Sequence, residues 1–274
     1  MKAPIFMATA LVAVLALSTC GRAALAIPTV SVGAGDFSFN LVDSIPAGRT
    51  RVQLTNNGKE GHHAQLLRLN QGVTLDRFRA ALRQGFEAWL PLVTLEGGPA
   101  GVAPGGKSEA MVNLQPGQYM VVCLESGPDH VPHLFKGMIK PLTVTAAPAA
   151  QPPEPKAEGT VAMSDFEFGP LSSLKASQVT LKVVNKGREA HELVVLRLKG
   201  ISAAEANQVL TRIFTMPGAT GWANFFEEVG GLMAIMPGAT GWATVDLKSG
   251  DYVLICTVPS PPNRAAPHIA LGMS

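Results

Sequence analysis

GQYMVVC at residues 117–123 returns near the end of the chain as GDYVLIC at residues 250–256. Each stretch opens with a glycine that suits a turn and continues in aromatic, β-branched and other apolar residues, which is typical of a buried strand. Each strand ends in a cysteine, Cys123 or Cys256. The recurrence predicts two similar β-units, each with one cysteine at the end of a core strand.

Three further segments recur around these strands in the same order. DFSF at residues 36–39 returns as DFEF at 165–168, NNGKEGH at 56–62 as NKGREAH at 185–191, and PHLFKGM at 132–138 as PHIALGM at 267–273. Between the two sets, residues 147–157 are rich in Pro and Ala and poor in large apolar residues, which indicates an extended linker. The sequence therefore predicts a first domain at residues 27–146 and a second at residues 158–274.

Both predicted domains show the pattern of an all-β unit. Short runs such as RVQL at residues 51–54 and QVTLKVV at residues 178–184 alternate or are β-branched, and Gly, Pro and Asn bound them. We therefore predict an all-β fold class with two tandem Greek-key β-sandwiches. Each sandwich is expected to carry a short helical insert, at residues 74–83 and 203–214, the second with a capping box of Ser202 and Glu205.

The first residues indicate export. Lys2 precedes an apolar run, and a small-residue stretch ends Ala24-Leu25-Ala26, so residues 1–26 are predicted to be a signal peptide that is cleaved before Ile27. A membrane anchor and a lipoprotein site at Cys20 are the alternatives. The run is shorter than the roughly 20 residues that a membrane-spanning helix needs, and Thr19 suits lipoprotein cleavage poorly. We expect a periplasmic or secreted protein.

Charge and hydropathy restrict the partners. The formal net charge is +2, and removal of Lys2 and Arg22 with the signal peptide leaves a nearly neutral chain. A protein that binds nucleic acid needs a basic surface, so nucleic acid is not expected as a partner. Beyond the signal peptide, no apolar stretch approaches membrane-spanning length, so the mature chain is not expected to span a membrane.

The two predicted domains end differently. The first continues after Met138 through residues 139–146, which supply a last strand, whereas the second stops at Met273-Ser274. The second domain is therefore expected to lack its last strand and to leave an open sheet edge beside the Cys256 strand. A truncated reading frame and a functional open edge both explain this pattern.

Four of the six histidines of the chain, His62, His133, His191 and His268, lie in the matching segments, and the other two, His63 and His130, lie within two residues of them. Each half then offers the same four donor residues in the same order: His62, Cys123, His133 and Met138, and His191, Cys256, His268 and Met273. A Cys123–Cys256 disulfide is the alternative that an oxidising compartment permits. The two cysteines occupy the same position in separate sandwiches, and a disulfide needs α-carbons about 4.4 to 6.8 Å apart. One site per domain is therefore favoured.

These motifs resemble those of the cupredoxins, the plastocyanin-like blue (type 1) copper proteins. In that family the first His follows an Asn-rich turn, the Cys ends a strand that opens Gly-x-Tyr, and the second His and the Met follow in the next loop. The resemblance implies two cupredoxin-like domains, copper as the cofactor, the eight residues above as ligands, and one-electron transfer with a redox partner protein. This chain departs from the family in its long loops between Cys and His, at residues 124–132 and 257–267.

Several alternatives stand beside this interpretation. His63 and His130 have no histidine counterparts in the second half and are expected to face solvent or to lie behind the ligands, although His130 competes with His133. A metal-free fold or a non-redox copper-handling module is the second hypothesis. A hydrolase that uses Cys123 and His133 is disfavoured because Asp129 is not repeated. Neither cysteine has a flanking His for further copper centres, so the chain is not expected to be an enzyme.

Overall fold

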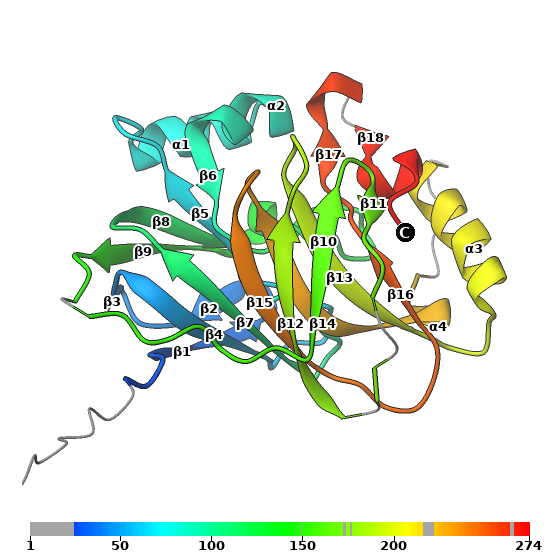
Figure 1. The fold of residues 1–274 in the computed structure, drawn as a ribbon. Coiled ribbons are helices and arrows are strands. Elements are labelled where there is room, and N and C mark those ends of the chain that lie inside the picture. The colour runs from blue at the N-terminus through cyan, green and yellow to red at the C-terminus, as the bar shows by residue number, and fades with distance from the viewer. Residues whose placement is uncertain (1–24, 149, 172–173, 176, 216–221, 264–265) are drawn as a thin grey trace, which may run out of the picture.

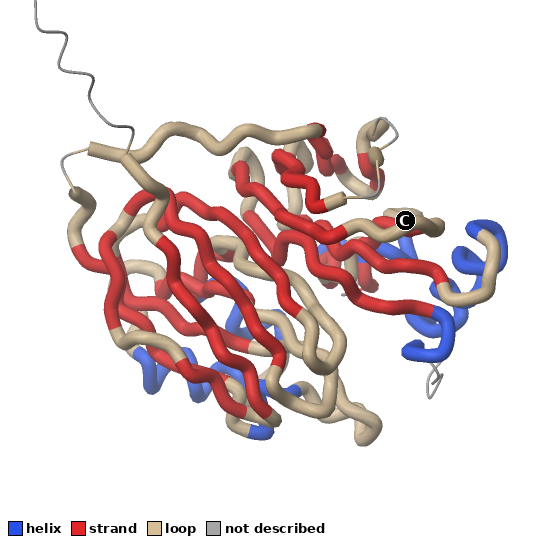
Figure 2. Tube along the Cα trace, turned by 90° about the horizontal axis from the view of Figure 1, so that it is seen from below, coloured by secondary structure: helices blue, strands red, loops and turns tan. Residues whose placement is uncertain are grey.

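The computed structural model describes residues 25–274 except 149, 172–173, 176, 216–221 and 264–265 (Figure 1). Only the last two residues of the predicted signal peptide are among them. Strands dominate the described chain, and the helices lie at its periphery (Figure 2). The prediction of an all-β fold class is confirmed.

In the first half the strands are β1 (Thr29–Gly35), β2 (Ser38–Asn40), β3 (Ser44–Pro46), β4 (Gly48–Asn56), β5 (Gln65–Leu69), β6 (Val93–Leu95), β7 (Lys107–Leu114), β8 (Gly117–Val122) and β9 (Ile139–Thr145). In the second half they are β10 (Gly159–Ser164), β11 (Glu167–Phe168), β12 (Gln178–Asn185), β13 (His191–Leu198), β14 (Phe226–Ile235), β15 (Thr240–Asp246), β16 (Tyr252–Ile255), β17 (Pro259–Ser260) and β18 (Ala266–Pro267). The helices are α1 (Leu75–Leu82), α2 (Phe86–Trp89), α3 (Ala203–Thr215) and α4 (Trp222–Phe225), with short 3₁₀ helices η1 (Leu90–Leu92), η2 (His133–Lys136), η3 (Pro261–Asn263) and η4 (His268–Leu271).

The largest sheet runs through both halves of the chain. Its order is β11-β10-β12-β15-β7-β4-β1-β2, and β15 pairs with β7 through Trp242 opposite Met111 and Thr244 opposite Glu109. A five-stranded sheet, β3-β9-β8-β5-β6, and a three-stranded sheet, β14-β13-β16, complete the main layers. The two sandwiches therefore share one continuous layer, which the repeats did not predict.

A second connection joins the halves beside this sheet. Isolated bridges link Glu96 to Ile235, Pro99 to Leu232 and Val102 to Val229. Within the first half, the backbone at Gly98 also approaches Ala64 closely, because φ is +129° and a Cβ would lie 2.0 Å from the Ala64 carbonyl oxygen. Only glycine fits such a position. The same segments contact the histidine segments, because Val102 also bridges to His62 and Ile235 pairs with His191.

Both helical inserts form where the sequence predicts them. The Thr74 side chain accepts a hydrogen bond from the Arg77 N–H at 3.2 Å and caps α1. At α3, the Ser202 N–H donates to Glu205 at 2.7 Å and the Glu205 N–H donates to the Ser202 hydroxyl at 3.3 Å. These reciprocal bonds are the predicted capping box.

The predicted linker contacts both halves. The Arg49 N–H donates to the Gln151 side chain at 3.0 Å, and Lys182 forms an ion pair with Glu154 at 2.9 Å. The domain boundaries themselves stay a prediction, as does the missing last strand. Among the described strands, β16 pairs with β13, whereas its counterpart β8 lies between β5 and β9.

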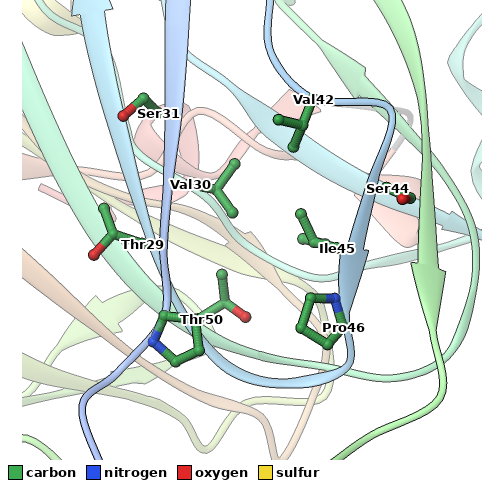
Figure 3. A pocket seen from close by; sticks show the side chains of 9 residues that line it. Thr29, Val30, Ser31, Val42, Ser44, Ile45, Pro46 and Thr50 are labelled. Atoms are coloured by element: carbon green, nitrogen blue, oxygen red, sulfur yellow. The ribbon is translucent and has the colours of Figure 1, made fainter.

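A surface pocket of about 360 Å³ lies between β1 and β3, with Val30, Val42 and Ile45 among its lining residues (Figure 3). The lining is apolar side chains, prolines and hydroxyl groups, and includes no histidine, cysteine or carboxylate. The pocket therefore offers none of the donor groups on which the predicted site depends.

Candidate metal centre

The first His–Cys–His group lies at one end of the first sandwich. Cys123 follows β8, His62 bridges to Val102 just before β5, and His133 opens η2. His62 Nδ1 is 3.1 Å from His133 Nδ1, and the Cys123 sulfur is 3.9 Å from His62 Nδ1 and 3.6 Å from His133 Nδ1. All three residues are buried. The structure thus brings together residues that are far apart in the sequence.

The second group repeats this arrangement. His191 Nδ1 is 2.9 Å from His268 Nδ1, and the Cys256 sulfur lies 3.9 Å from His191 Nδ1 and 3.3 Å from His268 Nδ1. These residues are also buried, and both cysteines are free thiols. In the part of the chain that the structure describes, these are the two groups of such residues close enough to hold a metal ion.

Each long loop folds back on itself through backbone pairing, so that the second histidine lies next to the cysteine. In the first loop Ser126 pairs with Pro132, the His133 N–H donates to the Glu125 carbonyl at 2.7 Å, and the Leu134 N–H donates to the Cys123 carbonyl at 2.8 Å. In the second loop β17 pairs with β18, and the Ile269 N–H donates to the Cys256 carbonyl at 2.8 Å. The extra residues therefore project outward while the ends of each loop stay together.

The predicted axial methionines are buried beside the same loops. Met138 is 0% exposed; its N–H donates to the His133 carbonyl at 2.9 Å, and its carbonyl accepts from the Cys123 N–H at 3.2 Å. Met273 has the matching bonds to His268 and Cys256, at 3.0 and 3.3 Å. Backbone hydrogen bonds thus tie each methionine to both other loop residues, and the ligand role of its sulfur stays a prediction.

The chemistry of the donor set fits a copper ion. Each histidine Nε2 faces a carboxylate, which can only accept a hydrogen bond, so Nε2 carries the ring proton. Burial lowers the pKa of His62 and of His268, so both rings are neutral near pH 7. Their Nδ1 lone pairs therefore point at each group's interior, beside a sulfur. Two imidazoles and a thiolate suit copper in both oxidation states.

Burial also raises the pKa of the Cys123 thiol, and that of the Cys256 thiol well above its usual range. The thiolate is the metal-binding form, so each cysteine must lose a proton when metal binds. The lowered pKa of His62 and His268 means that Nδ1 of each ring is already unprotonated at neutral pH, so metal binding displaces no proton from these two rings.

We therefore expect copper affinity at each group to rise about tenfold per pH unit between pH 7 and pH 9, because one thiol proton is released per ion. Copper titration in weakly buffered, oxygen-free solution should release one proton per bound ion. Cys123→Ser with Cys256→Ser is the matched control and should release none from these groups. An affinity that does not change across this range would contradict the assignment of the thiols as ligands.

His63 and His130 lie outside the donor groups. His63 is 4% exposed; its Nε2 accepts from the Leu124 N–H at 2.8 Å, and its Nδ1 is 3.1 Å from Glu125. Glu192 replaces it in the second half and accepts from the Thr257 N–H at 2.8 Å. Both side chains hold the backbone just after the cysteine. His130 is exposed, with φ +57°.

Four carboxylates at these groups were not among the predicted site residues. Asp36 and Glu60 face the two rings of the first group, and Asp165 and Glu189 face those of the second. All four lie in segments that recur between the halves, so their recurrence is the sequence feature that could have identified them.

Comparisons with known proteins give structural neighbours alone. No family model matches the chain, and no curated protein does. An auracyanin from Roseiflexus castenholzii matches 45% of this chain and 99% of its own at 20% identity, with a TM-score of 0.29. A blue copper oxidase from Nitrosomonas europaea matches 85% and 80% at 12% identity (TM-score 0.28), and a copper-containing nitrite reductase from Thermus scotoductus matches 87% and 58% at 14% identity (TM-score 0.25).

These comparisons correct one prediction. The expectation that the chain is not an enzyme is contradicted, because matched structures that span most of the chain include an oxidase and a reductase. The expectation rested on the absence of a His beside either cysteine. That absence removes one way of building further copper centres, but a fold can host carriers and catalysts alike.

Among the described residues, no helix combines the length and the apolar character that crossing a membrane requires. In the large sheet the strand order β7-β4-β1-β2 recurs as β15-β12-β10-β11, and the cysteine at the end of a core strand and the two buried histidines beside it recur in each half. The chain has a cupredoxin-like fold with two His–Cys–His groups that are able to bind copper.

Proposed function

We propose that this protein is an exported, periplasmic or secreted copper protein that binds one copper ion at each His–Cys–His group and exchanges single electrons with a redox partner protein. The observation that carries the proposal is the enclosed donor set of His62, Cys123 and His133, with both Nδ1 atoms and the sulfur within 3.9 Å of one another. The apolar N-terminal segment supports export.

Bound copper would supply a one-electron couple, and the protein supplies a rigid and dry environment for it. His62 and Cys123 are 0% exposed and His133 is 1% exposed, so water is excluded from the donors. Backbone hydrogen bonds fix the cysteine, the second histidine and Met138 relative to one another. Donors that keep their positions require little rearrangement when the charge changes, and this favours fast electron transfer.

Anaerobic reconstitution tests the proposal. We expect two copper ions per chain, an intense visible thiolate-to-copper absorption in the oxidised protein, and reversible bleaching when one electron per site is added. A colourless protein that still binds two ions would support the non-redox copper-handling module instead. A protein that binds no copper would support the metal-free fold.

A further inference from the structure

We propose that Asp36 and Glu60, with their counterparts Asp165 and Glu189, are positioning residues that fix both ligand imidazoles of each group and favour the oxidised state of the bound copper. The inference rests on the proposed function. It also accounts for two recurrent motifs, DF and N-x-G-x-E-x-H, which the ligands alone leave mostly unexplained.

The aspartate of the DF motif holds the first histidine. An Asp36 carboxylate oxygen lies 3.1 Å from His62 Nε2, and the same carboxylate accepts from the Lys59 N–H at 2.9 Å. In the second half, Asp165 lies 2.8 Å from His191 Nε2 and accepts from the Arg188 N–H at 3.0 Å. Each carboxylate therefore has a fixed position and holds the ring with Nδ1 toward the cysteine.

The glutamate of the second motif holds the other histidine. Glu60 lies 2.8 Å from His133 Nε2, and Glu189 lies 3.2 Å from His268 Nε2. The motif's asparagine fixes the glutamate backbone, because Asn56 Nδ2 donates to the Glu60 carbonyl at 2.8 Å. Phe37 packs edge-on against His133 with ring centroids 5.0 Å apart. Both rings of the group are thus oriented from outside.

The glycine of the motif makes room for this contact. A Cβ at Gly58 would lie 2.2 Å from an Asp36 carboxylate oxygen and 2.6 Å from His62 Nε2. At Gly187 the corresponding distances are 2.3 Å to Asp165 and 2.6 Å to His191. Glycine is therefore required because the carboxylate and the imidazole approach each other at this position. The same requirement holds in both halves.

The carboxylates also act through their charge. Two negative charges lie one imidazole away from each donor set, and they stabilise a doubly charged oxidised ion more than a singly charged reduced one. The Asp36 and Glu60 side chains are 29% and 28% exposed, so solvent screens part of this effect. Removing either charge should therefore raise the reduction potential without removing the metal.

The test uses the full chain with Cys256→Ser, so that only the first group carries a complete donor set. Asp36→Asn and Glu60→Gln keep the size and an acceptor oxygen but remove the charge. Asp129→Asn is the control, because Asp129 lies in the Cys–His loop of the first group but pairs with Lys136 rather than with a histidine. Gly58→Ala keeps both charges and displaces Asp36 from His62. Copper content and reduction potential are measured for each variant.

We expect copper content to persist in Asp36→Asn and Glu60→Gln while the preference for the oxidised state falls about tenfold in each, a rise of about 59 mV for a one-electron couple. Gly58→Ala should weaken copper binding about 10–100-fold. Reduction potentials of copper-loaded Asp36→Asn and Glu60→Gln that equal the potential of Asp129→Asn would overturn the inference. If Asp36→Asn does not fold, the potential of Glu60→Gln alone decides the test. A Cys256→Ser parent that binds no copper would instead refute the proposed function.

Discussion

Replacing Cys123 by serine in a Cys256→Ser background is expected to abolish the visible thiolate–copper absorption and to weaken copper binding by more than about 100-fold. This exceeds the 10–100-fold loss typical of residues behind the ligands, because a direct donor is removed. Cys123 is 0% exposed, and its sulfur lies 3.9 Å from His62 Nδ1 and 3.6 Å from His133 Nδ1. Serine keeps the shape of the side chain but lacks the soft thiolate.

The single variants make this result quantitative. Cys256→Ser alone should keep one copper per chain and the absorption of the first group, and Cys123→Ser alone should keep those of the second. Circular dichroism of the metal-free double variant should match that of the parent, which separates ligand loss from unfolding. A visible band that survives in the double variant would show that the sulfur of neither cysteine is a ligand.

The core strands beside the cysteines and the helices α1 and α3 could be predicted because their signals are local. Residues 117–122 form β8 and residues 252–255 form β16, as their continuous apolar character indicated, and Thr74 and Ser202 start helices through caps visible in the sequence. The continuous eight-stranded sheet could not be predicted in this way. Its central pair, β7 and β15, is joined by residues such as Met111 and Trp242, whose identity says nothing about which strand they face.

The candidate site likewise has features that the sequence indicates and features that depend on contacts between distant segments. The recurrence of His62, Cys123 and His133 as His191, Cys256 and His268 predicted which residues the structure brings together. The loop closures depend on backbone pairing, such as Ser126 with Pro132, which no side-chain pattern encodes. Asp36 and Glu60 recur as faithfully as the histidines, but a repeated carboxylate becomes meaningful only when the imidazole it faces is known.

The second large effect is expected on copper binding when His133, rather than His130, is replaced. His133→Ala in the Cys256→Ser background should weaken copper binding by more than about 100-fold, because it removes the Nδ1 donor 3.6 Å from the Cys123 sulfur. His130→Ala is the matched control in the same loop. His130 is exposed on the outward excursion, and surface substitutions of this kind usually change stability by less than about 0.5 kcal/mol.

Isothermal titration of both variants with copper, together with metal content after desalting, distinguishes the two residues. We expect His130→Ala to bind like its parent and His133→Ala to lose the ion on desalting. His268→Ala in a Cys123→Ser background should reproduce the loss, because His268 Nδ1 lies 3.3 Å from the Cys256 sulfur and the second loop has no other histidine. Unchanged copper content in His133→Ala combined with loss in His130→Ala would show that the loop rearranges around the metal, with His130 as the ligand.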